Sequence, residues 1–154
     1  MNKNKRVKQL KFIASIFNLA LEEIQDTLGF ETLTMIFRRV GEVSGKKIAE
    51  RFNGQYNNID EFGKLLIDFV INPVIGEGKG HISKEGDNLI VKLDACPYKK
   101  AGGFPIEDMR FFCHYTEGMI DTAIKTAFPD DEFKTTPDKL IASGCEHCRY
   151  IVEK

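Results

Sequence analysis

The chain has 154 residues, of which 42% are hydrophobic and 29% charged, and its formal net charge is −1. A chain of this length fits one domain that buries a core without help from disulfides or metals. The near-neutral charge gives no general case for binding nucleic acid or an acidic membrane surface. We therefore expect a single domain over residues 1–154, with a solvated, basic start at Lys3, Lys5, Arg6, Lys8 and Lys11.

The first apolar stretch, FIASIFNLALEEI, is interrupted by Asn18 and ends in acidic residues. It is shorter than the roughly 20 apolar residues of a membrane span and does not resemble a secretory signal. We expect a cytoplasmic protein without a membrane span, in which thiols stay reduced. Reduced thiols favour metal or redox roles for the four cysteines over disulfides.

Helical periodicity predicts a first helix over residues 5–29, with Gly29 as a C-cap. Its apolar positions recur at helical spacing over a wide arc: Leu10, Phe12, Ile13, Ile16, Phe17, Leu19, Ala20 and Ile24. A stripe this wide indicates burial on two sides, against the domain and against a partner chain.

A second helix is predicted over residues 31–52. We expect one of its faces to be buried through Leu33, Ile36, Phe37, Val40 and Ile48. Two glycines, at 41 and 45, each cost about 1 kcal/mol relative to alanine inside a helix. The simplest compensation is close approach of another backbone across the missing side chains.

The rest of the chain alternates between helical and strand patterns. A third helix is expected from an N-cap at Asn58 to the neighbourhood of Pro73, followed by a β-hairpin that turns at residues 85–88. A long helix over residues 105–128 is opened by Pro105 with acidic Glu107 and Asp108. Two short strands joined by a turn at Gly144 complete an α+β fold, in which an antiparallel sheet packs against helices.

Cys145 and Cys148 form a C-x-x-C pair, which lets two thiolates bind one tetrahedral zinc. Cys96 and Cys113 would complete a closed structural site with no open position for water. The alternatives are reduced cysteines packed as small hydrophobes, a redox C-x-x-C, and catalytic chemistry.

Other groups near the cysteines stand as substitutes at the metal: His114, His147 and Glu117. A nucleophilic pair of Cys113 with His114 is disfavoured, because consecutive helical residues project about 100° apart. Glu117 is better placed as a metal ligand or as a polar group in a pocket.

The chain has 12 phenylalanines and no tryptophan. Aromatic and apolar side chains on the predicted helices are typical of a core, and they also suit an apolar ligand pocket between helices and sheet: Phe12, Phe17, Phe62, Phe69, Phe111, Phe112, Tyr115 and Met119.

Two segments, FFCHYTEGMIDTAI and ASGCEHCRYIVEK, resemble the 4-vinyl-reductase-like, hydrocarbon-binding domain family. The positions that match its pattern are Cys113, Gly118, Gly144, Cys148 and Tyr150, and RRVGEVSGKKIAERF is similar to its early glycine-bearing helix. The resemblance implies a dimeric α+β module that binds small apolar or aromatic molecules, with a structural zinc beside the pocket. Vesicle-tethering subunits share this general fold.

The sequence departs from the family at two places. Sensor members have a glutamate and a cysteine as zinc ligands where this chain has residues near Pro137 and Leu140, which do not bind zinc. Cys145 and Cys96 would have to replace them. The segment DACPYKK, which contains Cys96, also resembles the aminothiazoline-carboxylate hydrolase-like proteins and keeps an enzymatic interpretation open.

We therefore expect a stand-alone, zinc-stabilised domain that binds or senses a small apolar or aromatic molecule, as a homodimer through the first helices. The predicted zinc ligands are Cys96, Cys113, Cys145 and Cys148. The first alternative is a small hydrolase or reductase, aminothiazoline-carboxylate hydrolase-like or vinyl-reductase-like, acting in the same pocket. A protein-assembly module that relies on the first helix is the other.

Overall fold

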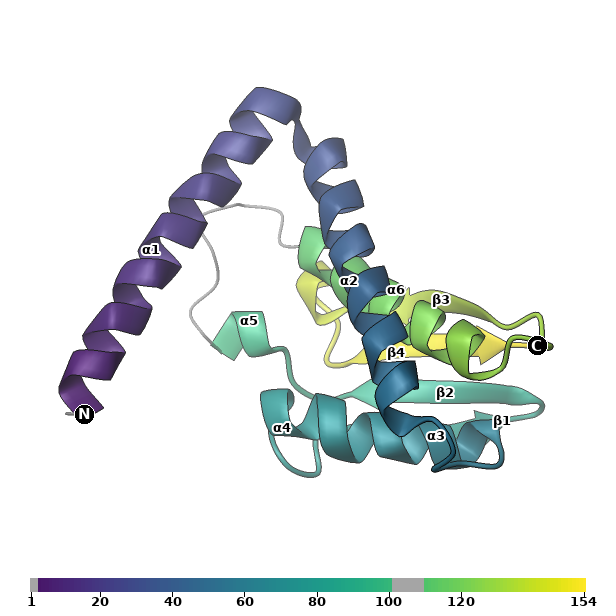
Figure 1. Cartoon of the computed structure of the whole chain (residues 1–154). Coiled ribbons are helices and arrows are strands. Elements are labelled where there is room, and N and C mark those ends of the chain that lie inside the picture. The colour runs from purple at the N-terminus through teal and green to yellow at the C-terminus, as the bar shows by residue number, and fades with distance from the viewer. Residues whose placement is uncertain (1–2, 101–109) are drawn as a thin grey trace.

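The structure is a computed structural model that describes residues 3–100 and 110–154. Two long helices, α1 (Lys3–Leu28) and α2 (Phe30–Phe52), come first and form an open V, with α1 standing apart from the rest of the molecule (Figure 1). Gly29 separates them with a φ of 83°, in the left-handed region that favours glycine. The first two predicted helices are confirmed.

The third helical segment combines three elements: α3 (Ile59–Leu66), the π-helix η1 (Ile67–Ile71) and α4 (Asn72–Ile75). Asn58 is the N-cap, as predicted, and its Oδ1 accepts a hydrogen bond from the Glu61 N–H at 3.0 Å. Helical structure continues past Pro73, because this proline lies in the first turn of α4, where a missing N–H is tolerated.

Four antiparallel strands form one sheet in the order β1-β2-β4-β3. The hairpin of β1 (Gly80–Glu85) and β2 (Asn88–Leu93) turns where the sequence predicted. After β3 (Lys134–Lys139), a short 3₁₀ helix η2 (Ile141–Ser143) leads to Gly144, whose φ of 90° turns the chain into β4 (Cys148–Glu153). Both predicted hairpins and the turn at Gly144 are confirmed.

Two further helices follow β2: the short α5 (Pro97–Lys100), which the sequence did not predict, and the long α6 (Arg110–Ala127). The predicted opening of the long helix at Pro105, with Glu107 and Asp108, lies outside the described residues. No helix within the described ranges has both the length and the apolar character needed to cross a bilayer.

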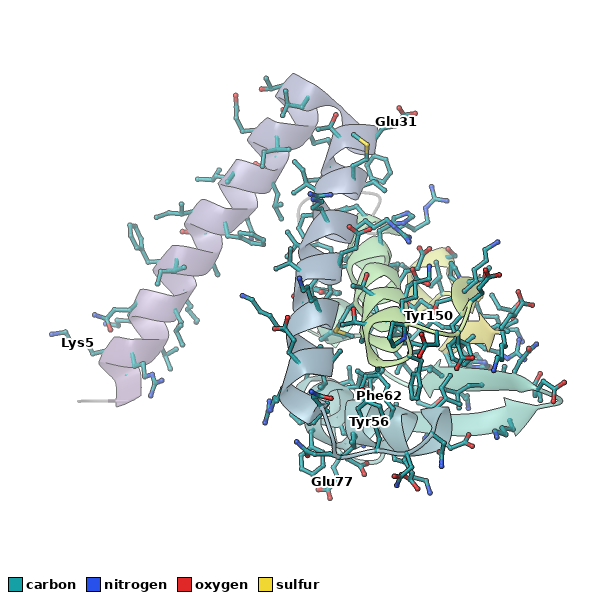
Figure 2. The ribbon with its side chains drawn as sticks, turned by 45° about the vertical axis from the view of Figure 1, so that its right-hand side comes forward. Lys5, Glu31, Tyr56, Phe62, Glu77 and Tyr150 are labelled. Atoms are coloured by element: carbon teal, nitrogen blue, oxygen red, sulfur yellow. The ribbon has the colours of Figure 1, made fainter. Side chains whose placement is uncertain are left out.

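The main core lies between the sheet and the helices that cover one of its faces (Figure 1). Alternate residues of the two central strands face this core, as the period of two requires. Tyr150 on β4 and Phe62 on α3 are among its largest fully buried side chains and lie in the body of the molecule, away from α1 (Figure 2). The α+β class with an antiparallel sheet packed against helices is confirmed.

Helices α2 and α6 pack with their backbones in close contact, and three glycines make this possible. A Cβ atom added to Gly41 or Gly45 would overlap the carbonyl oxygens of Tyr115 or Met119, and one added to Gly118 would lie 2.6 Å from the Arg38 carbonyl oxygen. The predicted close approach of another backbone across Gly41 and Gly45 is therefore confirmed, and its partner is α6.

This glycine contact also corrects the predicted burial of α2. Leu33 is buried and Phe37 and Ile48 are partly buried, but Ile36 and Val40 are exposed. The reason is that the glycine face of α2, and not the face with most large apolar side chains, lies against α6. The aromatic side chains proposed for a core or a pocket include three exposed ones, which correct that prediction: Phe12, Phe17 and Phe69.

A second, smaller apolar cluster fixes the end of α1 to the body. Leu21 of α1 is 2% exposed and packs with Leu33 of α2 and with Phe111 and Phe112 of α6. Tyr98 of α5 packs against the same cluster. The first half of α1, in contrast, is exposed.

Candidate functional site

An apolar cavity of about 260 Å³ lies between the third helical segment, the end of β2, α5 and α6. Ten residues line it: Val70, Ile71, Val74, Ile75, Leu93, Pro97, Tyr98, Tyr115, Thr116 and Met119. Seven of the ten are aliphatic, proline or methionine side chains, and the other three end in hydroxyl groups. This composition is typical of a small-molecule site, in which apolar walls carry a few polar groups that orient the ligand.

The π-helix supplies one wall of the cavity. In η1 the N–H of Asn72 donates to the carbonyl of Ile67, five residues earlier, and this wider turn leads Val70 and Ile71 into α4. Asn72 in turn accepts a hydrogen bond from the Gly80 N–H at 2.8 Å, which ties α4 to the first strand. π-turns of this kind recur at functional sites in proteins.

Tyr98 of α5 closes the opposite side. Its ring stacks on Phe112 of α6 with centroids 4.1 Å apart and an interplanar angle of 25°. Burial raises the pKa of Tyr98 above its ordinary value, and neighbouring Tyr115, Cys96 and Cys113 raise this pKa further. The Tyr98 hydroxyl is therefore neutral at physiological pH and offers the cavity a hydrogen-bonding group without charge.

Thr116 connects the cavity to the core. The Thr116 side chain forms a hydrogen bond with the Tyr150 hydroxyl. Burial raises the pKa of Tyr150 well above its ordinary value, Cys148 and Cys113 raise it further, and the Thr116 hydrogen bond opposes them. Tyr150 lies on a central strand of the sheet and is fully buried, so the cavity lies next to a tightly packed part of the core.

The four cysteines come from three segments, after β2, on α6 and at the start of β4, and none forms a disulfide. Cys148 is buried in β4, and burial raises the pKa of its thiol. The Ile141 N–H donates a hydrogen bond to Sγ at 3.3 Å, which lowers this pKa, whereas Cys96 and Cys145 raise it further. Cys113 acts electrostatically on Tyr98 and Tyr150. Cys96 and Cys113 thus lie near Tyr98, and Cys113 and Cys148 lie near Tyr150. Cys145 lies near Cys148.

These thiols do not form a ready metal site as the side chains stand. Over residues 3–100 and 110–154, no group of three or more histidine, cysteine, aspartate and glutamate side chains is arranged to hold a metal ion. The zinc on Cys96, Cys113, Cys145 and Cys148 therefore stays a prediction. Pro137 and Leu140, at the places where the family has two ligands, line one hollow together with Cys113 and bring no donor to it.

This hollow, of about 700 Å³, is separate from the apolar cavity and more polar. Cys113, His114 and Glu117 line it, while none of them lines the apolar cavity. His147, the remaining substitute, lines neither. From the sequence we expected these groups beside the ligand pocket. In the structure Cys113, His114 and Glu117 lie outside the apolar cavity, because they project from another side of α6.

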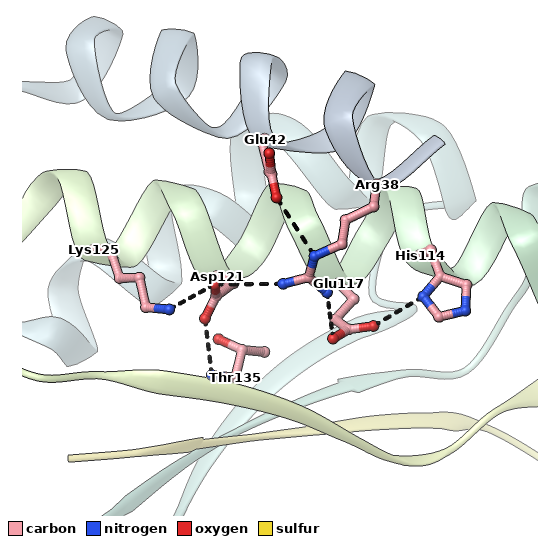
Figure 3. Close-up of polar contacts among 7 residues, drawn as sticks. All are labelled: Arg38, Glu42, His114, Glu117, Asp121, Lys125 and Thr135. Carbon is pink, nitrogen blue, oxygen red and sulfur yellow. Dashed lines mark hydrogen bonds and ion pairs between the residues drawn. The ribbon is translucent and has the colours of Figure 1, made fainter. Parts of the chain in front are cut away.

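Glu117 belongs to a polar network that joins α2 to α6 (Figure 3). Arg38 donates to Glu117 at 2.6 Å, and His114 Nδ1 lies 3.3 Å from the other carboxylate oxygen. Burial alone would lower the pKa of Arg38, but the hydrogen bond and charge of Glu117, together with the charges of Asp121 and Glu42, outweigh it, so this pKa is raised. The Glu117 carboxylate is thus held by two cationic or hydrogen-bonding partners.

Asp121 extends this network to the sheet. Its Oδ1 accepts a hydrogen bond from the Thr135 N–H at 3.0 Å, and its Oδ2 accepts one from Lys125 at 2.8 Å (Figure 3). Arg38 joins α2 to α6 and Asp121 joins α6 to β3, so this network fixes the three elements together.

Sequence reasoning identified Tyr115 and Met119 as possible pocket residues and missed the rest of the cavity. Tyr98 and Pro97 were missed because α5 is too short for a periodic pattern, and only their position directly after Cys96 pointed to them. The η1 residues were assigned to an ordinary helix, because a π-turn leaves no signal in the hydrophobic pattern.

No family model matches the chain, and no curated protein matches it in sequence. Among solved structures, the phenol-responsive sensory domain of the transcription activator PoxR, with phenol, aligns with a TM-score of 0.61 and 15% identity over 89% of this chain and 72% of that one. A trafficking protein particle complex subunit 3 from Naegleria fowleri, covalently bound to palmitic acid, aligns with a TM-score of 0.59 and 10% identity over 92% and 95%.

A vinyl-4-reductase family protein from Methanocaldococcus jannaschii aligns at 13% identity, over 94% of this chain and 80% of that one, with a TM-score of 0.42. The first two alignments show that the chain has the fold of that sensory domain and that trafficking subunit. These are the two kinds of protein to which the resemblance with the 4-vinyl-reductase-like family pointed, so the predicted fold is confirmed.

Proposed function

We propose that the chain binds a small, uncharged apolar or aromatic molecule in the 260 Å³ cavity under α5. The observation that carries this proposal is the composition of the cavity wall. Its described residues include three hydroxyl groups and no carboxylate, ammonium, guanidinium or imidazole. A charged ligand would be buried there without a partner, at a cost of several kcal/mol.

The size of the cavity limits the ligand to about one substituted ring. An apolar cavity of about 150 Å³ is enough to bind benzene, and 260 Å³ leaves room for substituents. The solved structures of the same fold support the chemistry: PoxR's domain was solved with phenol and the trafficking subunit with palmitic acid. A single ring with a hydroxyl group fits this wall better than a long chain does.

The test compares three ligands of similar size by isothermal titration calorimetry and thermal shift. Phenol and toluene should bind and raise the unfolding temperature, whereas benzoate should bind at least about tenfold more weakly because its carboxylate would lose hydration. If neither phenol nor toluene gives a signal at millimolar concentration, binding in this cavity is wrong.

A pair of tryptophan variants assigns binding to the cavity. Val74 lies on the cavity wall and is 65% exposed, so Val74→Trp can obstruct the cavity without overpacking the core. Ser83→Trp introduces the same indole on the exposed strand β1, away from the cavity and from the two helices at the chain's start. Val74→Trp should abolish phenol binding and Ser83→Trp should leave it unchanged; equal effects would place the ligand elsewhere.

We also propose the structural zinc on Cys96, Cys113, Cys145 and Cys148. Two observations support it: Cys96 and Cys145 lie close enough to Cys148 to raise the pKa of its thiol, and Cys113 lies near the same Tyr150 as Cys148. Zinc would supply cross-links between the end of β2, α6 and β4, and the thiols would have to draw closer together to hold it. None of the four thiols is in a disulfide, as expected for the reducing cytoplasm that we propose as the location.

We further propose a homodimer through the first two helices. Both helices expose large apolar side chains on faces that the body of the protein does not cover. Exposed faces of this kind on α2 are formed by Met35, Ile36, Val40 and Val43. The alternative, a small hydrolase or reductase in the same cavity, gains no support from its described wall, because Cys113, His114 and Glu117 line the separate hollow.

A further inference from the structure

The first helix has two different apolar faces. The body of the chain covers the inner face only near its end, because Leu10, Ile13 and Phe17 on that face are exposed. On the inner face, Leu21 is buried and Ile24 is partly buried against α2 and α6. On the outer face, Phe12, Ile16 and Leu19 are 66%, 51% and 64% exposed. Figure 2 shows this helix apart from the body, with its side chains, including Lys5 near its start, projecting into solvent.

The outer face continues beyond its apolar centre in both directions. Residues spaced three or four apart lie on one side of a helix, and the outer stripe defined by this spacing consists of Lys5, Lys8, Phe12, Ile16, Leu19, Glu23 and Asp26. All seven are exposed. The stripe therefore has two cations at its start, three apolar residues in the middle and two carboxylates at its end.

This order of charges is self-complementary when two copies of the stripe run in opposite directions. If the two helices cross between Ser15 and Ile16, Lys5 faces Asp26 of the second copy and Lys8 faces its Glu23. In the same register Phe12 faces Leu19, so apolar groups meet in the centre. Each contact occurs twice, as the two-fold symmetry of a homodimer requires.

A parallel pair would have the opposite energetics. Lysine would then face lysine at one end and carboxylate would face carboxylate at the other, and like charges in register are unfavourable. We propose that the outer stripe of α1 pairs antiparallel with the same stripe of a second copy of this chain, with Lys8–Glu23 and Lys5–Asp26 contacts setting direction and register. This inference rests on the homodimer proposed above and adds its geometry.

The decisive experiment measures the dimer dissociation constant of the full chain by sedimentation equilibrium at low salt. Lys8→Glu places two carboxylates opposite Glu23, and Glu23→Lys places two ammonium groups opposite Lys8. Each variant should raise the dissociation constant about tenfold or more, since two attractive pairs become two repulsive ones. The double variant Lys8→Glu/Glu23→Lys restores opposite charges and should return within about threefold of the unchanged protein.

A matched control makes the same charge change off the stripe. Lys11 lies on the polar side of α1 together with Asn18 and Glu22, so Lys11→Glu should change the dissociation constant by less than about threefold. Raising the salt concentration should weaken the dimer of the unchanged protein, because the contacts attract. Circular dichroism of each variant verifies that the helix content is retained.

Two results would overturn the inference, and they are distinguishable. A protein that remains monomeric at all concentrations removes both the homodimer and its geometry, while phenol binding in the cavity can still be measured. A dimer that Lys8→Glu and Glu23→Lys leave unchanged removes the antiparallel pairing alone. A ligand-free cavity with a dimer that responds as expected would overturn the proposed binding function and leave this inference standing.

Discussion

At the scale of single residues, the contact between α2 and α6 depends on the absence of a side chain at three glycine positions. Gly41, Gly45 and Gly118 have no Cβ, and each lies directly against a carbonyl group of the other helix. Glycine inside a helix destabilises it by about 1 kcal/mol relative to alanine. The packing contact between the two helices must therefore stabilise the fold by more than this amount. The sequence revealed the low helix propensity at Gly41 and Gly45, and the structure shows the helix contact that compensates for it.

Replacing Gly45 by alanine tests this balance through the sign of the stability change. Helix propensity alone would stabilise the protein by about 1 kcal/mol. Overlap of the new methyl group with the Met119 carbonyl forces α2 and α6 apart, and overpacking of this kind typically costs about 1–3 kcal/mol. We expect net destabilisation by Gly45→Ala, measured by urea unfolding.

Ser44 provides the control on the same helix. Its hydroxyl donates to the Val40 carbonyl at 3.0 Å, and it does not belong to the glycine contact. Ser44→Ala should change the free energy of unfolding by no more than about 0.5 kcal/mol, and the favourable direction is expected from helix propensity. A stabilised Gly45→Ala variant would contradict the close contact.

At the scale of elements, the third helical segment is predictable at its start and not in its middle. Its N-cap is local: Asn58 accepts from the Glu61 N–H, and the Glu61 carboxylate accepts from the Asn57 N–H at 2.8 Å. Such reciprocal contacts involve residues three or four apart, so the sequence carries the signal. The π-helix has no comparable signal, because it depends on packing around the cavity.

The reciprocal cap predicts a pH-dependent contribution to stability. Hydrogen bonds from the Asn57 backbone and side chain lower the pKa of Glu61. A lowered pKa in the folded state means that the contribution is fully present above the ordinary glutamate pKa, and is lost as the pH falls through the lower folded value. The stability advantage of the unchanged protein over Glu61→Gln should therefore be present at pH 7, begin to fall at about pH 4, and disappear once the pH is below the lowered folded pKa.

Asn58→Ala is the matched control for this prediction, since asparagine does not titrate. Loss of the N-cap should cost about 1 kcal/mol at both pH values. Chemical unfolding at pH 7 and at acidic pH gives both comparisons. A Glu61→Gln difference that is as large at low pH as at pH 7 would show that the carboxylate charge has no part in the cap.

At the scale of the whole molecule, the predicted zinc would link segments that are distant in the sequence. Cys96 follows β2, Cys113 lies on α6, Cys145 precedes β4 and Cys148 begins it. Protein purified under reducing conditions should contain about one zinc per chain, and its removal by a chelator should cost several kcal/mol of stability. Metal analysis and thermal unfolding provide the measurement.

Cys148→Ser separates metal binding from packing. The thiol is buried, so the variant loses some stability through packing alone, and its metal content has to be measured together with its unfolding temperature. We expect the variant to lose zinc and to be less stable than the chelated protein only by the packing contribution of the buried thiol. Zinc below about half an equivalent in the unchanged protein, with no further effect of a chelator, would contradict the prediction.

The sequence by itself determined the fold class and the longer elements, but not α5 or the π-helix η1. Apolar residues at a period of 3.6 or 2, the N-cap at Asn58 and the turn at Gly144 are local signals, because they depend on neighbours within a few positions. Only the tertiary structure decided which face of α2 is buried, that Tyr98 closes the cavity, and that His114 and Glu117 lie outside it. These outcomes depend on contacts between elements far apart in the chain, and such contacts leave no periodic trace in the residues that make them.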